Sequence, residues 1–116
     1  MRIVVCEDDP LILMNIAEML HELGHRAEEA LDGASALLAL ANGEIDMLIT
    51  DIGLPDMNGI ELAARAREID AALPIIFSSG LGLANELAGH PRMAALNKPY
   101  SLQGLEAAID AVSGHD

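Results

Sequence analysis

Five side chains that can bind a cation or a phosphoryl group each follow a short apolar run of the chain. They are Glu7, Asp8, Asp51, Ser79 and Lys98, the last being the only lysine among 116 residues. Carboxylates without clustered histidines suit Mg²⁺, which binds one or two carboxylates, water and a phosphate oxygen. A carboxylate can also attack phosphorus and form an aspartyl phosphate. That transfer needs the phosphoryl charge neutralised by a metal ion, an ammonium group and a hydroxyl. These residue types therefore indicate phosphoryl transfer to a carboxylate.

Each of these residues taken alone is equally typical of a helix cap or a turn. A parallel sheet would bring them together, because ligands bind outside the carboxyl ends of its strands. The apolar runs predict such a sheet, since they alternate with segments of helical period. The runs are residues 3–6, 26–30, 47–50, 74–78 and 93–97. The first, third and fourth lack a polar face, as central strands do, whereas residues 26–30 are polar enough for an edge strand.

Four helices are expected, three between strands and one after the last strand. The first begins at Pro10 behind Asp9 as N-cap and ends near Gly24, so we leave Asp9 out of the metal site. The others are expected at about 34–41, 59–68 and 102–112. Between residues 80 and 92, glycines and a proline interrupt the pattern, and we expect this stretch to be the most mobile. A single domain is expected over residues 1–116.

Composition excludes several classes of protein. Six basic and 19 acidic residues give a net charge of −13, which argues against binding nucleic acid or anionic membranes. An apolar fraction of 52% argues against a disordered acidic tail. The single cysteine, Cys6, lies in an apolar run and is expected to be a buried, inert thiol. No bilayer-spanning stretch or signal peptide is evident, so we expect a soluble cytoplasmic protein.

Four motifs, in this order, resemble those of two-component response-regulator receiver domains. They are residues 3–10 (IVVCEDDP), 50–59 (TDIGLPDMNG), 77–80 (FSSG) and 97–100 (NKPY). The resemblance spans essentially the whole chain. It implies an α/β fold of the flavodoxin-like, doubly wound type, with five parallel strands in the order 2-1-3-4-5 and helices on both faces. It also implies Mg²⁺ dependence and phosphorylation by a histidine kinase or a histidine phosphotransfer protein.

The resemblance also assigns roles to individual residues. Asp51 matches the phosphoacceptor and a metal ligand. Asp8 matches the direct metal ligand, the backbone carbonyl of Gly53 matches a third protein ligand, and Glu7 matches the neighbour that acts through water.

Two further positions match residues that contact the phosphoryl group. Ser79 corresponds to the hydroxyl that moves toward it, and Lys98 to the lysine that pairs with it.

The chain departs from the commonest receiver pattern in strand five, where Ala95 occupies the position of the aromatic switch residue. The usual coupling between the hydroxyl at the position of Ser79 and an aromatic side chain in strand five therefore cannot operate in its ordinary form. Residues 77–82 resemble the Phe-Ala-Thr-Gly motif of a subgroup of single-domain receivers that also lacks this aromatic and in which the following segment is thought to be mobile. Gly53 and Leu81 occupy positions that tune phosphoryl lifetime in receivers.

The first helix carries more apolar residues than its inward face needs, including Leu11, Leu13 and Met14. We interpret the surplus either as a wide buried face or as a docking surface for the kinase or phosphotransfer partner. The downstream partner stays unknown.

The preferred hypothesis is a signalling domain that catalyses only its own phosphorylation and dephosphorylation, with a conformational change after strand four. One alternative is a non-phosphorylated adaptor, although the set of Asp8, Asp51, Ser79 and Lys98 speaks against it. Another is a haloacid-dehalogenase-like phosphohydrolase, which would need an aspartate where Gly53 stands. No output module is evident, so both a stand-alone protein and a fragment of a hybrid kinase stay open.

Overall fold

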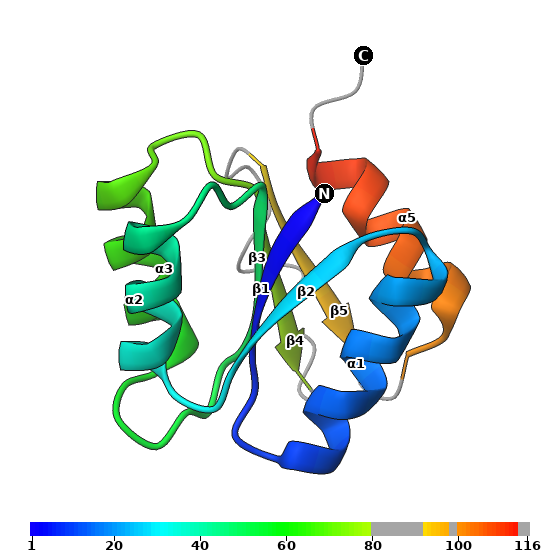
Figure 1. The fold of residues 1–116 in the computed structure, drawn as a ribbon, viewed down its shortest axis with the longest axis horizontal. Helices are drawn as coiled ribbons and strands as arrows, with labels where there is room; N and C mark the ends of the chain where they lie inside the picture. The colour runs from blue at the N-terminus through cyan, green and yellow to red at the C-terminus, as the bar shows by residue number, and fades with distance from the viewer. Residues whose placement is uncertain (80–91, 98–99, 114–116) are drawn as a thin grey trace.

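The computed structural model describes residues 1–79, 92–97 and 100–113, whose five strands form one parallel sheet (Figure 1). The strands are β1 (Arg2–Cys6), β2 (Arg26–Ala30), β3 (Met47–Asp51), β4 (Ile75–Ser79) and β5 (Met93–Asn97). Their order across the sheet is β2-β1-β3-β4-β5, so the chain winds to one side of β1 and then to the other. The predicted flavodoxin-like fold is confirmed.

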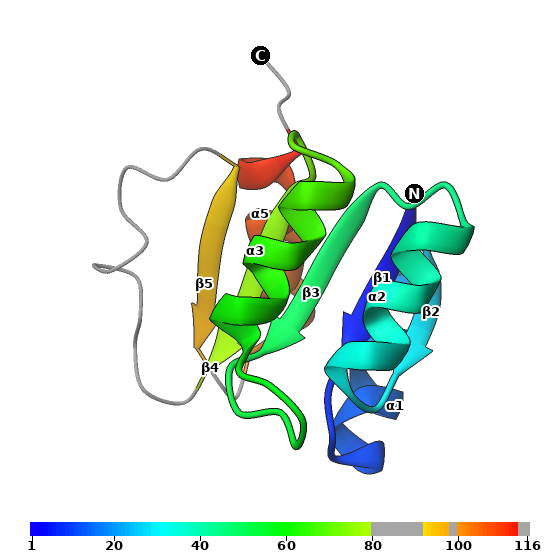
Figure 2. The same ribbon diagram turned by 90° about the vertical axis from the view of Figure 1, so that its left-hand side faces the viewer.

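Helices cover both faces of this sheet. The layer on one face consists of α1 (Pro10–Glu22) and α5 (Leu102–Val112), and the layer on the other consists of α2 (Gly33–Asn42) and α3 (Gly59–Ile69). Figure 2 shows α2 and α3 lying over the sheet, with β2 and β5 at its two edges. Among the described helices, none combines the length and apolar character needed to cross a membrane.

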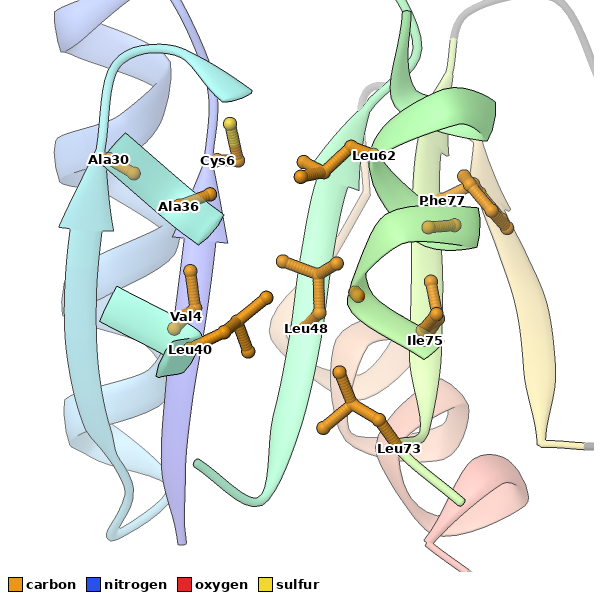
Figure 3. Close-up of a cluster of buried hydrophobic side chains, with 12 residues drawn as sticks. Val4, Cys6, Ala30, Ala36, Leu40, Leu48, Leu62, Leu73, Ile75 and Phe77 are labelled. Carbon is orange, nitrogen blue, oxygen red and sulfur yellow. The ribbon is translucent and has the colours of Figure 1, made fainter. Parts of the chain in front are cut away.

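Alternate residues of the central strands supply two separate cores, because successive side chains of a strand point to opposite faces. Toward α2 and α3, Val4, Leu48 and Ile75 from three strands are fully buried. Figure 3 shows these side chains packed with Leu40 of α2 and Leu62 of α3. The second core, toward α1 and α5, consists chiefly of Ile3, Val5, Ile49, Ile76, Leu20 and Leu105.

The helix that follows β1 begins where the sequence predicts. The side chain of Asp9 accepts hydrogen bonds from the backbone N–H of Leu11 (2.9 Å) and of Ile12 (3.4 Å), and Pro10 is the first helical residue. Gly24 has a φ of 86°, a left-handed conformation that suits glycine at the end of a helix. Because these signals are local, they place the carboxyl end of β1 beside the start of α1.

The strand polarity also agrees with the predictions. Every residue of β1 and β3 is buried except Arg2 and Asp51, whereas Arg26 and Glu29 of β2 are exposed, as is typical of an edge strand. The segment 80–91, in which we expect mobility, lies outside the described residues.

Candidate functional site

Three carboxylates meet where β1 and β3 end. These strands are neighbours, with Cys6 paired to Thr50, so the residues that follow them lie side by side. One oxygen from each of Glu7, Asp8 and Asp51 lies within 4.8 Å of the others. The sheet order reverses between these two strands, which is where open α/β sheets bind ligands. The structure thus brings together the three acids that the sequence suggested.

Glu7 is the buried member of the cluster, with a relative exposure of 2%. Its carboxylate accepts a hydrogen bond from the backbone N–H of Asp9 (3.1 Å), and its own N–H donates to the carbonyl of Ala30 (3.0 Å). Asp8 is exposed and Asp51 is partly buried. Negative charges this close repel one another, and burial strengthens the repulsion. A bound cation would remove that cost.

The donor atoms fit a small, hard cation. All three side chains offer carboxylate oxygens, the ligand type that Mg²⁺ prefers. Mg²⁺ binds oxygens at about 2.1 Å, so two direct ligands lie at most about 4.2 Å apart. Three oxygens within 4.8 Å of one another can therefore share one such ion, either directly or through a bound water.

The backbone that follows β3 folds back tightly and fixes the orientation of Asp51. The backbone N–H of Ile52 donates to Oδ1 of Asp51 (2.9 Å), and the N–H of Gly59 donates to the carbonyl of Ile52 (2.7 Å). A Cβ added to Gly59 would overlap the carbonyl oxygen of Asp51, so α3 can begin this close to β3 only with glycine there. The hydrogen bond from Ile52 holds the carboxylate of Asp51 close to the backbone of the next residue.

Gly53 lies in the loop 52–58, between β3 and α3. It forms an isolated antiparallel bridge with Asn58, and Asn58 caps α3 by accepting from the N–H of Glu61 (2.8 Å). Gly53 is exposed, and a Cβ added to it would meet nothing within 4 Å. Its carbonyl is the backbone ligand that the sequence suggests for the metal, and that role stays a prediction.

The same loop contains a residue that the sequence analysis missed. Both carboxylate oxygens of Asp56 accept hydrogen bonds from the first residues of α2, Gly33 and Ala34, each at 2.9 Å. These two bonds lower the pKa of Asp56 below its usual value, and the bond from Gly33 has the larger effect. An aspartate after a proline is typical of a turn, so nothing in the sequence indicated these partners.

Cys6 is the buried thiol that was expected. Its relative exposure is 1%, its Sγ lies 3.2 Å from the carbonyl oxygen of Asp32, and burial raises its pKa to about 12. A thiol protonated at neutral pH is a poor nucleophile.

The positions suggested to contact the phosphoryl group are only partly described. Lys98 and the side chain of Ser79 lie outside the described part of the structure, so their roles stay predictions. Ala95, at the position of the missing aromatic, is partly buried and pairs in register with Phe77. Ser78 pairs with Asp51 across β3 and β4 and is buried, with no hydrogen-bond partner for its hydroxyl among the described residues.

Comparison with known proteins gives consistent results. A family model described as the response regulator receiver domain matches residues 3–110. Response regulator receiver protein CpdR of Brucella abortus is 38% identical over 112 residues, covering 94% of this chain and 93% of CpdR. Sensor histidine kinase RcsC of Salmonella typhi is 30% identical over 94% of this chain, which spans 12% of that kinase. The crystal structure of a response regulator receiver protein from Sinorhizobium medicae superposes with a TM-score of 0.86 at 30% identity, covering 97% of this chain and 93% of the other.

Proposed function

Because the chain belongs to the family of response regulator receiver domains, we propose that Asp51 accepts a phosphoryl group from a phosphohistidine of a partner protein. The observation that carries this proposal is the convergence of Glu7, Asp8 and Asp51 at the ends of β1 and β3. Three acids around one point, one of them buried, suit a bound cation and a carboxylate nucleophile.

In the proposed reaction, a carboxylate oxygen of Asp51 attacks phosphorus while the P–N bond of the phosphohistidine breaks. The released imidazole nitrogen takes up a proton, and an aspartyl phosphate remains. Asp8, Asp51 and the Gly53 carbonyl would hold Mg²⁺, with Glu7 acting through water. When bound, Mg²⁺ would supply positive charge to the phosphoryl oxygens. The bond from Ile52 to Oδ1 limits rotation of the Asp51 carboxylate, which keeps it ready for attack.

On the resemblance to receivers, we assign the remaining charge neutralisation to Lys98 and a hydrogen bond to a phosphoryl oxygen to the hydroxyl of Ser79. Hydrolysis of the aspartyl phosphate at the same site returns the domain to its starting state, so it acts on itself and not on a separate substrate. The accompanying conformational change is proposed for the segment after β4. Because Ala95 replaces the aromatic switch residue, this change would not follow the usual coupling.

The donor of the phosphoryl group is proposed to be a histidine kinase or phosphotransfer protein in the cytoplasm, docking on α1. Leu11 and Met14 on this helix are 69% and 49% exposed, whereas Leu13 is buried. The exposed pair lies on the helix that directly follows Glu7 and Asp8, so a partner bound there would lie beside the acidic cluster. A non-phosphorylated adaptor would use the same surface without the chemistry.

Incubation with acetyl phosphate and Mg²⁺, followed by intact mass measurement, tests the proposal. We expect one added phosphoryl group, which Asp51→Asn or chelation of the metal abolishes. Asp9→Asn is the matched control, since asparagine caps a helix as well as aspartate and the same charge is removed next to the site. If neither acetyl phosphate nor a phosphorylated kinase changes the mass of the wild-type protein, the adaptor alternative is favoured.

A further inference from the structure

We propose that Asp56 is a positioning residue that fastens the loop 52–58 to the start of α2 and so holds the Gly53 carbonyl beside the acidic cluster. The proposal rests on the proposed function, because it concerns the metal site formed by that cluster. It assigns a role to a residue that is not itself one of the proposed metal ligands.

The polar part of this attachment uses both oxygens of one carboxylate. Oδ1 of Asp56 accepts from the N–H of Gly33, and Oδ2 accepts from the N–H of Ala34, each at 2.9 Å. The first N–H groups of a helix have no partner within it, and a carboxylate there is also favoured by the helix dipole. The helix's own N-cap, Asp32, accepts from Ser35 at 2.7 Å and leaves the other two donors to Asp56.

An apolar contact lies next to these hydrogen bonds. A Cβ added to Gly33 would lie 2.7 Å from Cγ and Sδ of Met57, so the Met57 side chain rests directly on the Gly33 backbone. Two consecutive loop residues therefore contact the start of α2: Asp56 through hydrogen bonds and Met57 through packing. Two adjacent contacts of different kinds fix the position of the loop better than either would alone.

The start of α2 is also connected to the end of β1, which Glu7 and Asp8 follow directly. The carbonyl of Asp32 accepts from the thiol of Cys6 at 3.2 Å, and Glu7 donates its N–H to Ala30 at 3.0 Å. The segment that leads into α2 is therefore attached to the end of β1, immediately before Asp8. Through Asp56, the loop with Gly53 is attached to the same segment.

Gly53 itself has little to hold it in place. It is exposed, and a Cβ added to it would meet nothing within 4 Å. Its bridge to Asn58 ties it to the part of the loop that Asp56 and Met57 fasten to α2. The position of its carbonyl relative to Asp8 therefore depends on that attachment.

Two alanine variants with the same change in charge separate this role from general effects. Asp56→Ala removes the carboxylate that links the loop to α2, whereas Asp32→Ala removes the carboxylate that caps α2 from within. Mg²⁺ affinity is measured by following backbone amide shifts of the folded proteins during titration with the metal alone. We expect about tenfold weaker binding in Asp56→Ala, typical of losing a group that orients a metal ligand, and less than about twofold in Asp32→Ala.

Hydrogen exchange of the amides in residues 52–58 provides a readout that needs no metal. We expect faster exchange in Asp56→Ala, confined to this loop and the first turn of α2, and wild-type exchange in the loop of Asp32→Ala. Asp56→Asn keeps the shape and one acceptor, so its affinity should lie between those of wild type and Asp56→Ala. It also serves if the alanine variant does not fold.

Equal Mg²⁺ affinities for Asp56→Ala and Asp32→Ala would overturn the proposal, because charge or helix stability would then account for the effect. Unchanged exchange in the loop of Asp56→Ala would overturn it as well. If the wild-type protein binds no Mg²⁺, the metal site of the proposed function fails instead, and the exchange data alone decide whether Asp56 fastens the loop.

Discussion

Replacing Gly59 with alanine tests how closely α3 must approach β3. The added Cβ would overlap the carbonyl oxygen of Asp51 and would lie 3.0 Å from both the carbonyl carbon of Asp51 and the Cα of Ile52. All three atoms belong to the backbone, so no side chain can rotate to relieve the overlap. The start of α3 must move away from the end of β3, and the hydrogen bond from Gly59 to Ile52 must lengthen.

The structure sets the size of the effect. Overpacking costs about 1–3 kcal/mol, and an overlap with rigid backbone belongs at about 3 kcal/mol. Alanine in place of glycine in a helix returns up to about 1 kcal/mol. The net loss in the free energy of unfolding is therefore about 2 kcal/mol. For a domain of this size, that lowers the Tm by about 8 °C.

Thermal and urea unfolding followed by circular dichroism measure this loss. Gly53→Ala is the matched control, because it makes the same change in the loop that leads to α3 but its Cβ would meet nothing within 4 Å. We expect the control to stay within about 0.5 kcal/mol of wild type. If Gly59→Ala is as stable as Gly53→Ala, α3 does not start against the Asp51 backbone and the description of the site is wrong.

Three further predictions concern the thiol, the loop attachment and the docking surface. The native Cys6 thiol should react with iodoacetamide at pH 8 about a thousandfold more slowly than the unfolded chain, because burial raises its pKa to about 12; equal rates would contradict that burial. Because the pKa of Asp56 is lowered in the folded protein, its carboxylate stabilises the fold above pH 4, and this stabilisation is lost as pH falls through the native pKa. Asparagine does not titrate, so the Tm of Asp56→Asn should decline less steeply below pH 4 than that of the wild type. Met14→Glu should slow phosphotransfer from the cognate kinase but not labelling by acetyl phosphate; a wild-type transfer rate, or an equal loss with Leu38→Glu on α2, would rule out docking at Met14.

Much of the fold follows from local signals in the sequence. Asp9 and Pro10 mark the start of α1 because a cap and the first-turn proline act within four residues. The polar residues of β2 indicate an edge strand, because a strand at the edge of the sheet pairs with another strand on one side only. The placement of Glu7, Asp8 and Asp51 at one edge follows from parallel strand geometry, which needs no knowledge of side-chain contacts.

The sequence could not show contacts between segments that only the folded chain brings together. Asp56 lies 23 residues from Gly33, and its two hydrogen bonds exist only once β2 and β3 have been placed on opposite sides of β1. The steric need for glycine at position 59 likewise depends on how α3 meets β3. Periodicity also left open which apolar residues of α1 face outward, whereas packing against the sheet buries Leu13 and exposes Leu11.

The most direct test of the central claim is to locate the phosphoryl group after labelling with acetyl phosphate and Mg²⁺. Borohydride reduces an acyl phosphate to an alcohol, which converts a phosphorylated aspartate to homoserine that tandem mass spectrometry can place in the sequence. We predict homoserine at position 51 only, and none when the metal is chelated. Homoserine at another aspartate, or an unmodified Asp51 in a protein that has gained a phosphoryl group, would contradict the account.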